Sequence, residues 1–113
     1  MSTTIFHNPR CSKSRQTLAL LEERNQEVVI VEYLVNPPDE SALRDILLKL
    51  EMSPRDIMRK KEAAEAGLND PALSDAELIS AMVQTPSVIE RPIVLANGKA
   101  RIGRPPESVL DIL

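Results

Sequence analysis

The run Val28-Val29-Ile30-Val31 constrains the fold of this 113-residue chain most, because successive β-branched residues favour a strand. The run continues to Leu34, and we expect residues 28–34 to form a strand that is buried on both faces, as in strands with parallel neighbours. Residues 3–7 are also β-prone, and residues 12–24 between the two segments have a partly apolar helical face. Together these segments predict a strand–helix–strand unit with a right-handed crossover.

The middle of the chain reads as helices, and its end as a hairpin followed by a helix. Asp39 is a good N-cap for a helix that ends near residue 50, and Ser74 with Glu77 forms a capping-box pattern at the start of another. Strands over 92–95 and 100–102 flank Asn97-Gly98, a type I′ turn signal. We therefore predict a single α/β domain over 1–113. It has a thioredoxin/glutaredoxin-like βαβ–ββα core and a helical insertion at about 39–86.

Composition excludes several function classes. The net charge of −3 and the presence of only two aromatic residues argue against nucleic-acid binding. No signal peptide is evident, and no apolar run approaches the ~20 residues of a membrane span. With one cysteine and one histidine, neither an internal disulfide nor a bound metal is expected. We expect a cytoplasmic monomer that has no membrane contact.

Cys11 is the candidate nucleophile. It follows the first strand and precedes the first helix, beside Arg10, Lys13 and Arg15. A helix N-terminus and nearby cations favour the reactive thiolate. The alternative interpretation is a buried structural thiol. Ser14 stands where a C-x-x-C motif has its second cysteine, so an outside thiol must complete any redox cycle. The Ser14 hydroxyl is expected to donate a hydrogen bond to the Cys11 sulfur.

Two further residues are expected near this thiol because of the fold. Thioredoxin-type folds place a cis proline before the third strand, facing the reactive cysteine, and Pro92 occupies that position. Arg91 would then point toward Cys11, although it could instead face solvent and pair with Glu90. His7 either tunes the thiolate or supports the loop that follows its strand.

More arginines suggest an anion pocket. Arg104 lies between Gly103 and a proline pair, and guanidinium forks suit phosphate, arsenate or a carboxylate. The cluster Arg59-Lys60-Lys61 could face the same pocket, or it could simply be a solvated charged run.

The chain resembles the glutaredoxin-coupled arsenate reductase family, which has a thioredoxin-like fold. The resemblance extends over almost the whole length. Its motifs are His7-Asn8-Pro9-Arg10-Cys11-Ser12-Lys13-Ser14-Arg15, Met58-Arg59-Lys60, Arg91-Pro92-Ile93-Val94 and Arg104-Pro105-Pro106-Glu107.

The resemblance implies a catalytic role for Cys11 and oxyanion binding by Arg59, Arg91 and Arg104, with a neighbouring lysine as the alternative to Arg59. It also implies that the Cys11 thiolate attacks arsenate to give a covalent arsenic–sulfur adduct. Glutathione is then the co-substrate and glutaredoxin the protein partner, with no bound cofactor.

Two other functions stay open. A monothiol transferase would add or remove glutathione on protein mixed disulfides, for which the C-x-x-S spacing is suited. A non-catalytic regulatory partner binder is the third possibility. A related regulatory branch of this fold family uses a C-x-x-C redox switch, which Ser14 removes here.

Overall fold

The computed structural model describes residues 3–24 and 27–113, which form two compact units. One unit combines residues 1–36 with 91–113, and the other consists of residues 37–90.

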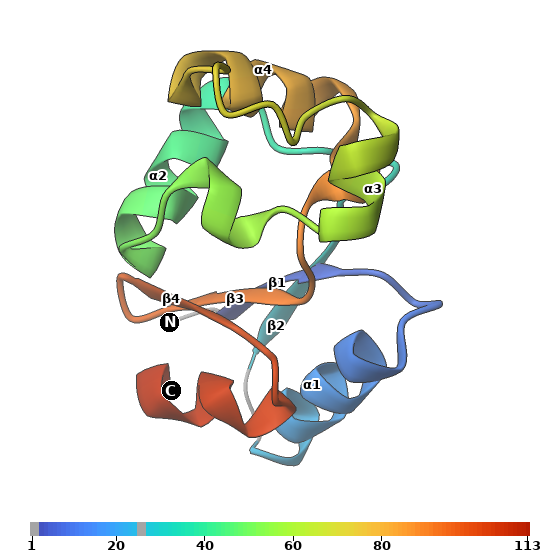
Figure 1. Cartoon of the computed structure of the whole chain (residues 1–113). Helices are drawn as coiled ribbons and strands as arrows, with labels where there is room; N and C mark the ends of the chain where they lie inside the picture. Colours follow the sequence, from blue (N-terminus) through green and yellow to red (C-terminus); the bar gives the residue numbers. More distant parts are fainter. Residues whose placement is uncertain (1–2, 25–26) are drawn as a thin grey trace. The chain divides into compact units, whose positions relative to one another are not determined.

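The first unit is built on a single four-stranded sheet (Figure 1). Its elements are β1 (Thr3–His7), α1 (Ser12–Glu23), β2 (Val28–Glu32), β3 (Ile93–Ala96), β4 (Lys99–Ile102) and the 3₁₀ helix η3 (Pro106–Ile112). The strand order is β2-β1-β3-β4. β1 pairs parallel to β2 and antiparallel to β3, and β3 pairs antiparallel to β4. The end of β1 therefore lies at the same end of the sheet as the end of β2, the start of β3 and the end of β4.

The core of this unit lies between the sheet and the two helices that pack against each other, α1 and η3 (Figure 1). Residues of β1 alternate in burial, so Ile5 points into the core with no exposed area. It clusters there with Leu21 of α1, Val94 of β3 and Val109 of η3. The predicted strand–helix–strand and hairpin–helix order is confirmed, although the last helix is 3₁₀ rather than α.

The expectation that the strand after α1 is buried on both faces is wrong. β2 ends at Glu32 and stands at the edge of the sheet with one neighbour, β1. Val29 and Ile30 are 48% and 49% exposed. Its parallel pairing with β1 is as predicted, but the β-branched run reflects strand propensity here rather than two-sided burial.

The hairpin between β3 and β4 has the predicted turn. Asn97 and Gly98 both have positive φ angles, of 55° and 76°, as a type I′ turn requires. The Asn97 amide also donates a 2.7 Å hydrogen bond to the Ile112 carbonyl, which joins the turn to the end of η3.

The second unit is helical. It contains α2 (Glu40–Leu50), η1 (Pro54–Ile57), α3 (Lys60–Glu65), α4 (Asp75–Gln84) and η2 (Pro86–Val88). The Asp39 carboxylate caps α2 by accepting from the Ala42 amide at 2.7 Å, and Ser74 and Glu77 form the predicted capping box of α4. No helix within residues 3–24 and 27–113 is long and apolar enough to cross a membrane.

The register of β1 against β2 provides a matched test of the core. Ile5 and Ile30 are paired residues of neighbouring strands, but Ile5 is 0% exposed and Ile30 is 49% exposed. We expect Ile5→Ala to lower the free energy of unfolding by about 2–5 kcal/mol and Ile30→Ala by about 1 kcal/mol or less. Urea denaturation measures both values. Equal losses would contradict the assignment of β1 to the centre of the core.

Candidate active site

The site forms where the sheet brings three chain segments to one end. β1 ends at His7 and leads into the loop that carries Cys11, and β3 begins just after Arg91-Pro92. β4 ends at Ile102 and leads into Gly103-Arg104. Residues more than 80 positions apart in the sequence therefore meet beside one thiol, as the sheet order requires.

Cys11 is a free, partly buried thiol at the N-cap of α1. Its carbonyl accepts the Arg15 amide at 3.0 Å, which begins the helix, and its own amide donates to the Asn8 carbonyl at 3.0 Å. The sulfur therefore sits at the positive end of a 12-residue helix, a position that favours an anion.

Arg104 is the cation in contact with the sulfur. Its Nη2 donates to Cys11 Sγ at 3.6 Å, and its Nε donates to the Arg91 carbonyl at 2.8 Å. The hydrogen bond to the Arg91 carbonyl fixes the guanidinium, and this orients Nη2 toward the Cys11 sulfur. The peptide bonds Arg91-Pro92 and Arg104-Pro105 are both cis; the first was predicted and the second was not.

Gly103 makes this approach possible. A Cβ at this position would lie 2.5 Å from Thr17 Oγ1 and 2.8 Å from Pro92 Cγ, far inside van der Waals contact. The Gly103 amide donates to the Pro92 carbonyl at 2.9 Å, and Thr17 is fully buried with its hydroxyl on the Lys13 carbonyl. The end of β4 thus packs directly on α1 and on Pro92, which places Arg104 over Cys11.

Ser14 does not support the sulfur, so the expected hydrogen bond from its hydroxyl to Cys11 is wrong. Ser14 is fully buried, its Oγ shares a 2.6 Å hydrogen bond with His7 Nδ1, and it accepts the Asn8 amide at 3.0 Å. The serine instead ties the loop to the end of β1. His7 accordingly supports the loop, one of the two roles that its position suggested.

Burial and charge act together on His7. Burial lowers the pKa of this imidazole below its ordinary 6.5, the nearby Glu32 carboxylate partly raises it, and the Arg15 guanidinium lowers it. The lowered pKa favours the neutral imidazole, which suits a ring nitrogen that shares a hydrogen bond with a hydroxyl.

The three basic residues close to Cys11 in the sequence differ in their contacts. Arg15 Nη1 donates to the Pro9 carbonyl at 2.8 Å and so braces the loop, whereas Arg10 and Lys13 are exposed. The sequence analysis did not predict the structural roles of Asn8 and Thr17. Asn8 Oδ1 accepts the Arg10 amide at 3.0 Å, and the Thr17 hydroxyl donates to the Lys13 carbonyl. An Asn-Pro pair is a turn signal and could have indicated the first of these.

Arg59 belongs to the unit of residues 37–90. It precedes α3, where its Nε donates to the Glu62 carboxylate at 3.0 Å and its Nη1 lies 3.8 Å from Glu90. The pKa of Glu62 is lowered by its own backbone amide and by the hydrogen bond from Arg59. Two carboxylates thus hold this guanidinium, so it is not simply part of a solvated run.

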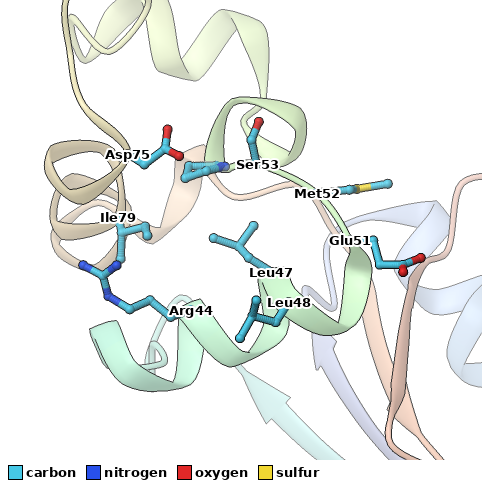
Figure 2. Close-up of a pocket in the computed structure, with 9 residues that line it drawn as sticks. Arg44, Leu47, Leu48, Glu51, Met52, Ser53, Asp75 and Ile79 are labelled. Atoms are coloured by element: carbon cyan, nitrogen blue, oxygen red, sulfur yellow. The ribbon is translucent and has the colours of Figure 1, made fainter.

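The second unit also contains a hollow of about 700 Å³ beside α2 and α4 (Figure 2). Leu47, Leu48 and Ile79 line it, with Arg44 and Asp75 at its sides. No thiol or imidazole is among its lining residues, so this hollow lacks a nucleophile of the kind that Cys11 provides.

Fold and site together define a thioredoxin-like protein with one free cysteine at the N-terminus of its first helix. The ArsC family model matches residues 6–112, and the chain belongs to this family. It is 57% identical over 112 residues to the uncharacterized protein YfgD of Escherichia coli K12, covering 96% of this chain and 94% of that protein. It is 52% identical to an arsenate reductase of Neisseria meningitidis serogroup A, covering 96% of each chain.

A solved arsenate reductase structure from Vibrio cholerae superposes with a TM-score of 0.96 at 47% identity. The match covers 100% of this chain and 98% of that one. The family and the thioredoxin-like fold class predicted from the sequence are thereby confirmed.

The close packing at Gly103 is directly testable. We expect Gly103→Ala to lower the free energy of unfolding by about 1–3 kcal/mol, because the new methyl group overlaps Thr17 and Pro92. It should also slow alkylation of Cys11 by iodoacetamide, because Arg104 moves with residue 103.

The double variant Gly103→Ala/Thr17→Ala removes two of the three closest contacts and should recover part of both losses relative to Thr17→Ala alone. A Gly103→Ala protein with wild-type stability and alkylation rate would contradict this role of the glycine.

The environment of His7 predicts a pH dependence of stability. Because folding lowers its pKa below 6.5, its contribution is complete above about pH 6.5 and is lost as the pH falls from there toward the folded-state value. We expect the stability lost between pH 7.5 and 5.5, measured by urea denaturation, to be smaller in His7→Gln.

NMR titration of this single histidine should give a midpoint below 6.5. A midpoint at or above 6.5 would show that the carboxylate of Glu32 outweighs burial.

Proposed function

We propose that this protein is an arsenate reductase in which Cys11 attacks the oxyanion and external thiols supply the electrons. The observation that carries the proposal is the 3.6 Å contact between Arg104 Nη2 and Cys11 Sγ. A thiolate and an arsenate anion repel each other, and a guanidinium fork held beside the sulfur offsets that repulsion while binding two oxygens at once. The names of the similar proteins from Neisseria and Vibrio support the same substrate.

In the first step, the Cys11 sulfur forms a bond to arsenic and an arsenate oxygen leaves as water after taking up a proton. Arsenic stays in its oxidised state, now as a covalent arsenic–sulfur adduct. Arg104 stabilises the negative charge that gathers on the remaining oxygens during this displacement. Arg91 and Arg59 are the further oxyanion-binding arginines in this proposal, as the family resemblance implies.

In the second step, glutathione joins the arsenic of the adduct and a second water leaves. The two sulfurs then couple as a disulfide, and the electron pair goes to arsenic, which departs as arsenite after water adds back. Two thiols have then lost two electrons and arsenic has gained them. Glutaredoxin removes the glutathione from Cys11 by thiol–disulfide exchange, which restores the thiol.

The lack of a second cysteine supports this dependence on outside thiols. The sequence contains one cysteine, so no internal thiol can resolve the mixed disulfide. The cycle needs no metal or bound cofactor, and it requires a reducing compartment, so we place the protein in the cytoplasm.

A second candidate function is reversible glutathionylation of protein thiols, which the Cys11-Ser12-Lys13-Ser14 spacing favours. That reaction needs the thiol but not a guanidinium fork for an inorganic anion. The two functions therefore differ in how strongly they depend on Arg104.

The decisive variants are Cys11→Ser and Arg104→Ala, assayed for arsenite production with glutathione and glutaredoxin. We expect Cys11→Ser to have no turnover, and Arg104→Ala to lose about 10²–10³ in kcat/KM for arsenate. Arg104→Lys should recover only part of the loss, because an ammonium lacks the planar fork.

Arg24→Ala is the matched control, since it removes an exposed arginine at the opposite end of α1 from Cys11. It should retain wild-type turnover. Full arsenate turnover by Arg104→Ala would overturn the proposal, and an equal loss in arsenate and mixed-disulfide turnover would show that Arg104 acts on the thiol rather than on the oxyanion.

A further inference from the structure

The loop that carries Cys11 has two flanks, which the sheet order defines. The start of β3 and the end of β4 bring Arg91 and Arg104 to one flank. The end of β2 lies on the other, because β2 pairs with β1 on the side away from β3 and His7 is in register with Glu32. The arginine flank holds the proposed oxyanion site, and the β2 flank has no part in it.

A pocket of about 350 Å³ lies on the β2 flank. One wall is the loop of residues 7–10, and the other consists of Glu32, Leu34 and Val35. We call it the loop pocket. Its volume falls at the lower end of the range of small-ligand sites.

Both walls of the loop pocket are held in place. His7 and Asn8 are buried and bonded to Ser14, and the Glu32 carbonyl accepts the amides of Val35 and Asn36 at 3.0 and 2.9 Å. By contrast, the residues Leu34 and Val35 are 44% and 75% exposed, so apolar surface is accessible beside a fixed turn. Such a pocket can take an aliphatic chain without rearranging.

The lining of the loop pocket includes one residue of each charge sign, Arg10 and Glu32, and both are exposed. Within the part of the chain that the structure describes, neither side chain forms a salt bridge or a side-chain hydrogen bond. Two charges of opposite sign in one lining do not favour an inorganic oxyanion. They match a ligand that carries both a carboxylate and an ammonium group.

The loop pocket is also within reach of the sulfur. Pro9 stands two residues before Cys11, a chain length of at most about 7 Å. An extended tripeptide is about 10 Å long, so one anchored at Arg10 and Glu32 can bring a central thiol to the adduct on Cys11.

We infer that the loop pocket binds the reducing thiol as a zwitterionic tripeptide, with a carboxylate on Arg10 and the ammonium on Glu32. The inference deepens the proposed function and rests on it for the identity of the peptide, glutathione. Oxyanion and reductant thus approach Cys11 from opposite flanks of one loop.

The test uses glutathione disulfide, which reports the loop pocket without arsenate. The Cys11 thiolate attacks one sulfur, the disulfide breaks, glutathione thiolate leaves and Cys11 becomes glutathionylated. 2-Hydroxyethyl disulfide, a neutral disulfide, undergoes the same exchange without charged groups. The ratio of the two rate constants, followed by mass spectrometry, therefore isolates recognition from the reactivity of the thiol.

We expect Arg10→Gln and Glu32→Gln each to lower this ratio about threefold. The Glu32→Gln variant gives the more discriminating test. Glutathione disulfide is an anion, so general electrostatics predicts that removing an acid raises the ratio, whereas loss of an ammonium contact lowers it. Glu22→Gln, with the same change of charge on an exposed residue of α1 outside the loop pocket, should not lower it.

A ratio that is unchanged or raised in Glu32→Gln overturns the inference. Failure of the proposed function would give a different result. The wild-type protein would then produce no arsenite, while both variants would still lower the ratio. If the wild type turns over arsenate but the ratio is unchanged in both variants, only the assignment of the loop pocket to glutathione is overturned.

Discussion

The site depends on how closely the end of β4 packs on α1. Gly103 has no side chain, and only for that reason can the backbone at this point touch both Thr17 and Pro92. The contact puts Arg104 beside Cys11 and leaves its Nε directed at the Arg91 carbonyl. One backbone contact thereby joins three segments that are distant in the sequence. Its electrostatic result is a guanidinium held at the sulfur, which a flexible surface arginine would not supply.

The loop before Cys11 is fixed by several hydrogen bonds. His7 and Ser14 share the shortest of these, the Asn8 carbonyl holds the Cys11 amide, and Arg15 braces Pro9. A loop tied at so many points leaves the thiol in one place while reactants arrive around it. The oxyanion site and the loop pocket are on different flanks of the loop because β2 and the β3–β4 pair lie on different sides of β1.

Much of this could be predicted from sequence, because its signals are local. The Ser74 capping box and the Asn97-Gly98 turn each depend on a few adjacent residues, whereas the cis bond before Pro92 was predicted from the fold assignment. Exposure of Val29 and Ile30 could not be predicted, since it depends on which strand occupies the neighbouring position. Ser14 likewise turns toward His7 because that buried ring is nearby in space. The basic residues next to Cys11 in the sequence do not contact its sulfur through any hydrogen bond that the structure shows, whereas Arg104, 93 positions away and predicted for the anion pocket, does.

The central claim is that one guanidinium holds an oxyanion against the Cys11 sulfur. The most direct measurement is the rate of Cys11 alkylation by iodoacetamide at increasing concentrations of sulfate, an unreactive oxyanion, in wild type and Arg104→Ala. The structure predicts saturable protection in the wild type, because the bound anion blocks the sulfur, and weak or no protection in the variant. An alkylation rate that does not respond to sulfate in the wild type, or equal protection of both proteins, would contradict the claim.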